Sequence, residues 1–278
     1  MKNTFTIGND LTINRLGYGA MRITGQGIWG APANKAEAIK VLQKAVELGV
    51  DFIDTADSYG PNVSEELIAE ALYPYPKGLV IATKGGFMRT GPNQWQINSH
   101  PDHLKEALAG SLKRLKVKQI DLYQLHRIDP KVPFEASLGF LKQAQNDGLI
   151  KHIGLSEVSV EEIEKARKHV DIVSVQNKYS IDNRQWEHEL EYCNKNNIAF
   201  IPWNPIQAGH LQDEGPLKKV ADKHNASINQ VALSWLLHHS DNILLIPGTS
   251  QVKHLEENIA AGKIKLTEED MAALNTIK

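Results

Sequence analysis

The sequence predicts an α/β fold, a single (β/α)8 TIM barrel that spans residues 1–278 as one domain and begins with an N-terminal β-hairpin. Eight short apolar runs alternate with helical patterns from residue 16 onward, and no linker interrupts them. Parallel strands need such helical crossovers, and strands buried on both faces appear as continuous apolar runs. Eight strand–helix units in 278 residues are typical of this barrel.

A doubly wound open sheet is the alternative fold, because it alternates strands and helices in the same way. Its dinucleotide fingerprint, Gly-x-Gly-x-x-Gly, would follow the first strand. The first strand here is the Gly-rich run at residues 16–20, and Gly17 and Gly19 alone do not make that fingerprint. The absence of the fingerprint favours the barrel.

Turn residues and apolar spacing place the elements in order. Residues 4–7 and 11–13 flank a Gly-Asn-Asp turn, which predicts the hairpin. The remaining strands are expected at residues 16–20, 52–54, 79–83, 120–125, 152–155, 172–175, 198–201 and 243–246. Helical spacing predicts helices at residues 35–48, 64–72, 102–115, 134–146, 160–169, 185–196, 216–224, 228–239 and 252–261. Ser64 is the expected cap of the second helix, and Thr267 with Asp270 forms a capping box that opens a last one.

The composition excludes several classes of protein. Basic and acidic residues nearly cancel, 31 against 33, so neither nucleic acid nor an anionic membrane is expected as a partner. No apolar run approaches the roughly 18 residues that a membrane span needs. The N-terminal residues lack the apolar core of a signal peptide, and Cys193 is the sole cysteine, which is expected to pack. A cytoplasmic location is expected.

Three successive strands are followed by reactive side chains. Asp54 ends the second strand, Lys84 follows the third and His126 follows the fourth, while Tyr59 lies in the loop after the second. Barrel enzymes carry their chemistry at the carboxyl ends of the strands. We therefore expect these four side chains to meet in one site.

Their chemistry suits proton donation to a carbonyl oxygen. A free phenol has a pKa of about 10, and a nearby ammonium lowers it by stabilising the phenolate. A lowering of about three units would correspond to roughly 4 kcal/mol. Asp54 would hold Lys84 charged, and His126 would hydrogen-bond the substrate oxygen. Taken singly, each residue also has a structural interpretation, as an ion pair, a satisfied histidine or a packed ring.

Several motifs occur in the order and spacing of one family. They are Leu16-Gly-Tyr-Gly, Phe52-Ile-Asp-Thr-Ala-Asp-Ser-Tyr-Gly, Thr83-Lys, Asp121-Leu-Tyr-Gln-Leu-His, Gly154-Leu-Ser, Val175-Gln-Asn, Ile201-Pro-Trp and Ile246-Pro-Gly-Thr with Glu257-Asn. Over nearly its whole length the chain thus resembles the aldo-keto reductase family. The resemblance implies that Asp54, Tyr59, Lys84 and His126 form a catalytic tetrad. Tyr59 would be the general acid, and a nicotinamide cofactor would supply the hydride.

The resemblance also implies a cofactor site. Ser156 and Gln176 would bind the carboxamide, and Trp203 would stack on the nicotinamide ring. The pyrophosphate loop and the surroundings of the adenosine half would include Gly209, Leu211, Gly248, Thr249, Glu257 and Asn258.

The chain departs from the family's pattern in two places. Glu157 stands where many relatives have an Asn that contacts the carboxamide, and an ionised Glu only accepts hydrogen bonds. Gly248 and His254 stand where many relatives have Lys and Arg to bind the 2′-phosphate. Lys253, His254 and backbone amides would serve instead. NADPH is the expected cofactor, with NADH as the alternative.

The substrate is expected to be a small carbonyl compound. The pocket rim would include Met21, Trp29, Phe87, Met88 and Trp95, which lie on the loops after strands one and three. His100 and His103 are interpreted as part of a helix start, so no metal site is expected.

The segment at residues 243–258 and the N-terminal hairpin most resemble bacterial family members related to pyridoxal reductases, which implies pyridoxal as substrate. Arg22 and Arg89 are the only fixed positive charges expected at the rim, so pyridoxal 5′-phosphate is expected to be a poor substrate. A broad aldehyde or ketone reductase is the alternative. The family also includes nicotinamide-sensing regulatory subunits, and the intact tetrad favours an enzyme. The oligomeric state stays open.

Overall fold

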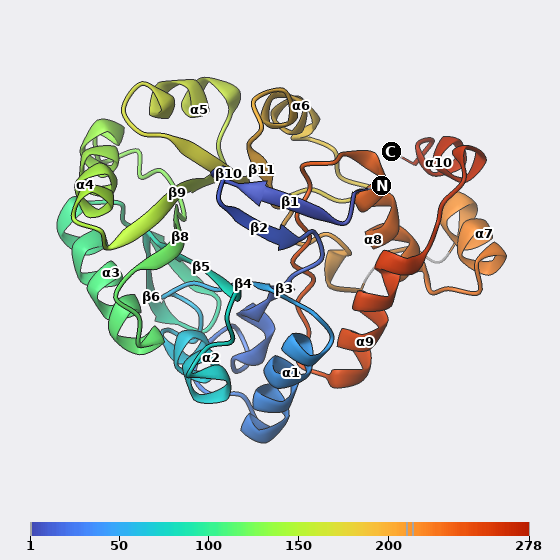
Figure 1. Cartoon of the computed structure of the whole chain (residues 1–278), viewed down its shortest axis with the longest axis horizontal. Coiled ribbons are helices and arrows are strands. Elements are labelled where there is room, and N and C mark those ends of the chain that lie inside the picture. The colour runs from blue at the N-terminus through green and yellow to red at the C-terminus, as the bar shows by residue number, and fades with distance from the viewer. Residues whose placement is uncertain (1, 210, 213, 278) are drawn as a thin grey trace.

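The computed structural model describes residues 2–209, 211–212 and 214–277, and its strands form a ring enclosed by helices (Figure 1). Seven strands of one sheet pair in parallel in the order β3, β4, β5, β8, β9, β10, β11. Their bounds are β3 (Tyr18–Gly19), β4 (Phe52–Asp54), β5 (Val80–Gly85), β8 (Ile120–Leu125), β9 (Ile150–Ser156), β10 (Ile172–Gln176) and β11 (Ala199–Phe200). The predicted (β/α)8 barrel is confirmed.

The predicted eighth strand closes the ring by isolated bridges. Leu245 pairs with Leu16 on one side, and Ile243 pairs with Phe200 on the other. The Arg15 side chain, which is only 1% exposed, reinforces this joint by donating from Nε to the Ile243 carbonyl at 2.9 Å and from Nη2 to the Ser240 carbonyl. The segment at residues 243–246 thus completes the barrel without forming a regular strand.

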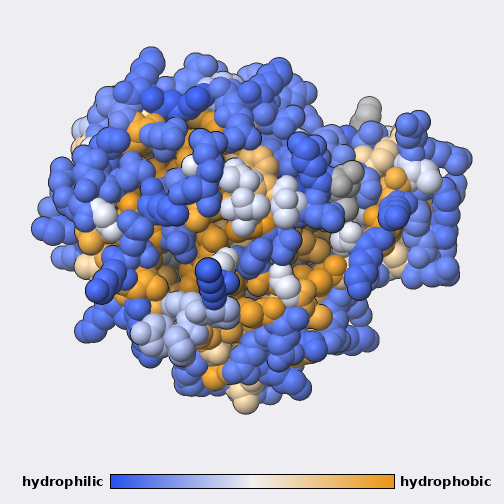
Figure 2. All heavy atoms as spheres, in the orientation of Figure 1, coloured by the Kyte–Doolittle hydropathy of each residue, from blue (hydrophilic) through white to orange (hydrophobic). Residues whose placement is uncertain are grey.

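The helices form the outer layer, and hydrophilic side chains cover most of them in the view of Figure 2. Helices α7 and α10 extend beyond the ring on one side (Figure 1). The bounds are α1 (Lys35–Glu47), α2 (Val63–Leu72), α3 (Pro101–Leu115), α4 (Phe134–Asn146), α5 (Val160–Arg167), α6 (Glu187–Lys195), α7 (Gly215–Lys223), α8 (Ile228–His239), α9 (Val252–Ala260) and α10 (Glu268–Leu274). Short 3-10 helices are η1 (Ala20–Ile23), η2 (Gln207–Gly209) and η3 (Ala261–Lys263). Within the described part of the chain, no helix is long and apolar enough to cross a membrane.

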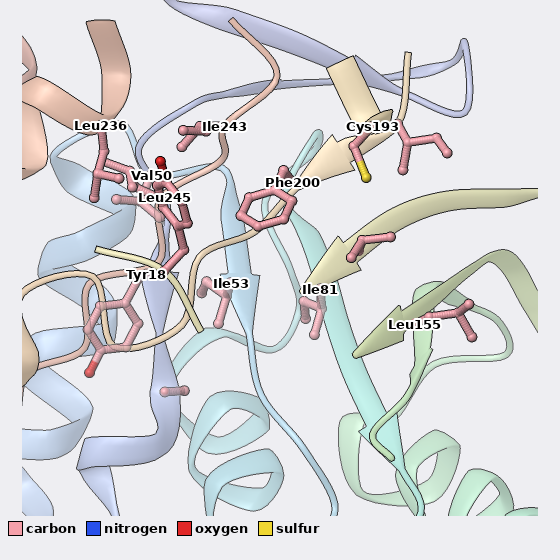
Figure 3. Packing of buried hydrophobic residues seen from close by; sticks show 14 of the residues in the cluster. Tyr18, Val50, Ile53, Ile81, Leu155, Cys193, Phe200, Leu236, Ile243 and Leu245 are labelled. Carbon is pink, nitrogen blue, oxygen red and sulfur yellow. The ribbon is translucent and has the colours of Figure 1, made fainter. Parts of the chain in front are cut away.

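Strand residues alternate between two apolar clusters, as the pleat of a strand requires. Ile53 and Ile81 belong to the cluster shared with the helices, as do Tyr18 and Phe200, and Figure 3 labels all four. Their neighbours Phe52 and Val80 belong to a second cluster inside the ring. The sole cysteine, Cys193, is buried in the first cluster, where burial raises the pKa of its thiol to about 12.

The N-terminal hairpin closes one end of the barrel. It consists of β1 (Thr4–Ile7) and β2 (Leu11–Asn14), and it lies across the ring in Figure 1. Ile7 and Ile13 are fully buried in the cluster inside the ring. This end meets the amino ends of the strands, so the carboxyl ends stay open at the opposite end.

Two local predictions were incomplete or wrong. The loop after β5 contains a second hairpin, β6 (Phe87–Gly91) with β7 (Gln94–Ile97), which was predicted only as a long loop. Ser64 is not the cap of α2, because the helix begins after Asn62 and the Ser64 hydroxyl donates instead to the Ala20 carbonyl at 2.9 Å. The capping box of Thr267 and Asp270 is confirmed.

Candidate active site

The four side chains predicted to meet do come together at the carboxyl ends of β4, β5 and β8. The Lys84 ammonium lies 2.5 Å from Asp54 Oδ1 and donates also to the Thr55 carbonyl at 2.8 Å. Its nitrogen lies 5.2 Å from the centre of the Tyr59 ring. The ring of His126 lies edge-on to that of Tyr59, with 5.9 Å between the ring centres. The sequence prediction that these strand ends converge is confirmed.

Asp54 is fully supplied with hydrogen-bond donors. Its Oδ1 accepts from Lys84, and its Oδ2 accepts from the side-chain amides of Gln124 and Gln176, each at 3.0 Å. A buried carboxylate needs such partners because an unpaired one would be costly. Gln124 therefore belongs to the support of the site, and the sequence analysis did not single it out.

Burial dominates the titration of Tyr59. It raises the pKa of the phenol, and Asp54 raises it further, while the Lys84 ammonium lowers it without reversing the effect. The Lys84 ammonium thus lowers the phenol pKa as predicted, but burial outweighs this effect and the pKa of Tyr59 lies above its ordinary value. Burial also opposes the charge of Lys84, but Asp54 and Tyr59 more than offset it, and the Lys84 pKa lies above its usual value.

His126 is held in its neutral form. Burial, together with the charges of Lys84 and Arg127, lowers its pKa well below the usual value. Its Nδ1 lies 3.5 Å from the hydroxyl of Ser58. A neutral imidazole keeps one N–H donor for a ligand oxygen.

A cavity of about 980 Å³ opens above these side chains. Its lining includes Asp54, Tyr59 and His126, but not the fully buried Lys84 behind them. The predicted cofactor residues in the lining are Ser156, Gln176, Trp203, Gly209, Gly248, Thr249, His254, Glu257 and Asn258. The predicted substrate residues in the lining are Met21, Phe87 and Trp95.

Other predicted residues lie outside the lining. Leu211 is buried in the apolar core, and residue 210 between it and Gly209 lies outside the described residues. The Lys253 side chain is 82% exposed on α9 and lies 4.0 Å from Glu257. Trp29 lies under the Arg89 guanidinium, with 5.8 Å between them, and Met88 is exposed.

Glu157 has a role that the sequence did not reveal. Its Oε1 accepts from the indole N–H of Trp203 at 2.6 Å and from the backbone N–H of Lys178 at 2.7 Å. Its backbone is left-handed, with φ of 55°. The carboxylate thus fixes the orientation of the Trp203 indole, which lines the cavity.

Arg89 was expected as a positive charge at the rim, and the structure gives it another role. Arg89 donates to five backbone carbonyls, including that of Ser58 at 2.8 Å, and stacks 3.7 Å from the centre of the Trp95 ring. It is therefore a clamp between loops and not a free charge at the rim. Arg127 lines the cavity instead. Its signal in the sequence was only its position next to His126. Further lining residues that were not predicted are Gly19, Ile28, Asn204, Pro205, Ile206, Ser227, Asn229, Ile246, Pro247 and Ser250.

The helix start predicted at this segment is confirmed: His100 caps α3, and its side chain accepts from the backbone N–H of Asp102 at 3.3 Å. Among the described residues, no group of three or more His, Cys, Asp or Glu side chains is placed to hold a metal ion.

Comparison with known proteins agrees with this geometry. Residues 15–278 match the model of the Aldo/keto reductase family. An uncharacterised oxidoreductase of Schizosaccharomyces pombe is 51% identical over 96% of this chain and 87% of its own. The pyridoxine 4-dehydrogenase of Escherichia coli is 43% identical over 99% and 98%. A thermostable aldo-keto reductase, solved with the inhibitor epalrestat, superposes with a TM-score of 0.87 at 32% identity and covers 99% of both chains.

Proposed function

The chain belongs to the aldo/keto reductase family of oxidoreductases, and we propose that it reduces pyridoxal to pyridoxine with NADPH. The meeting of Tyr59 and His126 in the lining of one cavity, with the Lys84 ammonium buried behind them, carries the proposal of carbonyl reduction. The identity of 43% with a pyridoxine 4-dehydrogenase supports the choice of substrate.

Tyr59 is the proposed acid. Its raised pKa keeps the phenol protonated at neutral pH, so that it can give its proton to the carbonyl oxygen. The phenolate that remains is stabilised by the Lys84 ammonium, which Asp54 holds in place. The neutral His126 would donate a second hydrogen bond to the same oxygen as charge develops on it.

The cavity has features that suit a nicotinamide dinucleotide. When bound, NADPH supplies the hydride. Trp203, fixed by Glu157, offers a flat face for the nicotinamide ring, and Ser156 and Gln176 offer polar groups beside it. Gly248 lines the cavity beside Gly19, and a Cβ atom at Gly248 would lie 2.7 Å from the Gly19 carbonyl oxygen, so the close approach of these two segments requires a glycine.

Of the two basic residues predicted to contact the 2′-phosphate on α9, His254 lines the cavity. We propose that it contributes to a preference for NADPH over NADH, with Thr249, Glu257 and Asn258 around the adenosine half. The side chain of Lys253 would add its charge from the rim.

A broad aldehyde reductase is the second candidate function. The aromatic lining of Phe87 and Trp95 favours it, because these rings would accept many aromatic aldehydes. Steady-state kinetics with NADPH and with NADH, on pyridoxal and on benzaldehyde, separate the two. We expect kcat/KM for pyridoxal with NADPH to be the highest of the four. If benzaldehyde matches pyridoxal, the vitamin assignment fails and the general reductase stands. No reduction of either aldehyde would favour a regulatory subunit.

A further inference from the structure

Arg127 lies beside the proposed acid site, at the cavity wall. Its Nη1 donates to the His126 carbonyl at 2.6 Å and to the Ser156 hydroxyl at 2.9 Å, which fixes the guanidinium. The same group lies 5.4 Å from the centre of the Phe87 ring, whose own centre is 4.6 Å from that of His126. A fixed cation therefore stands next to the place where the carbonyl would bind.

This cation lacks a carboxylate partner within salt-bridge distance among the described residues. Glu157 is the acidic side chain that influences it, but its Oε1 already accepts from Trp203 and from the backbone of Lys178. Burial lowers the pKa of Arg127, which reflects the cost of holding its charge away from water. Arg114, by contrast, pairs with the carboxylate of Glu65 at 2.7 Å.

Part of the guanidinium remains available to a ligand. The hydrogen bonds within the described residues use Nη1 only, so Nε and Nη2 keep their N–H groups. Neither nitrogen is fully enclosed without a partner, and the residue lines the cavity. A guanidinium presents its N–H groups in a planar fork that suits a carboxylate or an ionised hydroxyl.

We propose that Arg127 determines substrate specificity by binding an anionic oxygen of the substrate. This oxygen belongs to a group on the ring atom next to the one that bears the aldehyde. The substrate class is then aromatic aldehydes with an acidic group beside the aldehyde. The ionised ring hydroxyl of pyridoxal is such a group, and in this respect the inference rests on the proposed function. The binding of the anion would complete the charge balance of Arg127 and orient the carbonyl toward Tyr59 and His126.

The first experiment compares Arg127→Gln with the wild-type enzyme on matched aldehydes. The pairs are pyridoxal with its 3-O-methyl ether, and 2-carboxybenzaldehyde with 2-nitrobenzaldehyde, whose substituents have similar planar shapes but different charges. The ratio of kcat/KM within each pair cancels effects common to both substrates. We expect the preference for the anionic member to fall by about 10- to 100-fold, the range of a charge-assisted hydrogen bond. Unchanged ratios in both pairs would overturn the proposal.

Control variants separate recognition from general damage. Arg167→Gln removes a positive charge from the exposed face of α5, where Arg167 contacts Tyr192 and Asn196, and should leave the ratios unchanged. Arg127→Lys keeps the charge but loses the fork, and should retain an intermediate preference. If Arg127→Gln does not fold, the Lys variant still tests the proposal, and a wild-type ratio in it would contradict recognition by the fork.

Arg127 also contacts Ser156, so a role through the cofactor site must be distinguishable. Binding of NADPH, followed by quenching of tryptophan fluorescence, should change by less than about threefold in Arg127→Gln, well below one charge-assisted bond. Equal losses for all aldehydes together with weaker NADPH binding would show that Arg127 only positions Ser156, and would refute the proposal.

Two further measurements identify the anionic group that Arg127 binds. They also distinguish failure of this inference from failure of the proposed function. Pyridoxal 5′-phosphate carries its phosphate on the other neighbouring ring position. If the Arg127→Gln change lowers its kcat/KM far more than that of pyridoxal, Arg127 binds the phosphate and the ring-oxygen assignment is wrong. The benzaldehyde pair contains no vitamin, so a wild-type enzyme that ignores pyridoxal but prefers the carboxylate would refute the proposed function alone.

Discussion

Tyr59 and Asp57 lie two positions apart in one loop, and both are buried, yet they stand in different surroundings. The Tyr59 ring lies near an ammonium and an imidazole and borders the cavity. Asp57 lies behind it, and its Oδ1 is buried without a hydrogen-bond partner among the described residues. Burial, with Glu65 adding to it, raises the pKa of Asp57 to about 8, although Arg114 and Lys84 lower it. The loop thus holds Tyr59 beside the cavity, where it can take part in chemistry. It also holds Asp57, whose burial lowers the stability of the protein.

We expect Tyr59→Phe to abolish carbonyl reduction while NADPH still binds. The change removes the proton donor and keeps the ring, so kcat should fall by about 10²- to 10⁴-fold or more. Stopped-flow reduction kinetics and quenching of tryptophan fluorescence measure the two properties. Near-normal turnover would rule out Tyr59 as the acid.

Asp57→Asn should stabilise the protein increasingly as the pH rises. The folded-state pKa of about 8 lies above the ordinary aspartate value of 3.8, so the unfolded chain releases the proton first and the wild-type enzyme loses stability between about pH 4 and pH 8. The amide removes this loss, which we expect to be on the order of a few kcal/mol.

Urea unfolding at pH 5.5 and at pH 8.5 tests whether the stabilisation by Asp57→Asn increases with pH. The exposed carboxylate of Asp102 on α3 provides the control, since Asp102→Asn should give no gain that grows with pH. The expectation would be contradicted if the free energy of unfolding of Asp57→Asn differed from that of the wild type by the same amount at both pH values.

At the scale of elements, the loops of the site are held together by side chains and by backbone hydrogen bonds, such as that from the Asn93 N–H to the Gly27 carbonyl at 2.8 Å. Arg89, on β6, donates to the carbonyls of Gly27 and Ile28 after the first strand and of Ser58 after the second. The hairpin β6–β7 is thereby fixed to the loop that carries Tyr59. Trp95 on β7 stacks on the same guanidinium and lies edge-on to Tyr59, with 6.4 Å between the ring centres.

Helix α9 is the element we expect to distinguish the two nicotinamides. Replacing both Lys253 and His254 by Ala should weaken NADPH more than NADH, by about 10- to 100-fold, since a charge-assisted phosphate contact contributes about 1.5–3 kcal/mol. His254 lines the cavity and Lys253 is mostly exposed, so His254→Ala alone should account for most of the loss. Fluorescence titrations give both dissociation constants. Equal losses for the two cofactors would place the 2′-phosphate elsewhere.

Elements with strong local signals were predictable from the sequence. Helices α4 and α8 begin and end where their apolar spacing indicated, and β4 and β8 lie at the predicted apolar runs. The hairpin β6–β7 was missed because its side chains are largely exposed and its anchor, Arg89, bonds to carbonyls 61 and 62 positions away. Likewise, the sequence shows Arg127 but does not show that it lacks a carboxylate partner among the described residues. That depends on the Glu157 carboxylate, which accepts from Trp203 instead.

At the scale of the whole molecule, the barrel separates a stabilising end from an open one. The hairpin β1–β2 buries Ile7 and Ile13 against the amino ends of the strands, and the cavity lies at the carboxyl ends. Changes at the two ends should therefore act on different properties of the enzyme.

Ile13→Ala tests this separation. Removing a fully buried isoleucine should destabilise the protein by about 2–5 kcal/mol, because it leaves a cavity in the plug of the barrel. At 25 °C, kcat and KM should stay within about twofold of the wild type if enough protein remains folded. Chemical denaturation and steady-state kinetics give the two results. A loss of activity without a loss of stability would mean that the two ends are coupled.

The closing segment at residues 243–246 has a consequence for how a bound nucleotide acts on the protein as a whole. Its backbone joins the ring through hydrogen bonds between Leu245 and the Arg15–Gly17 stretch, and between Leu244 and Phe200. The cavity straddles this seam, with Gly19 on one side and Gly248 on the other. A dinucleotide bound across this seam would hold its two sides together. The amide hydrogens of residues 243–249 would then exchange more slowly with deuterium than in the protein without the nucleotide.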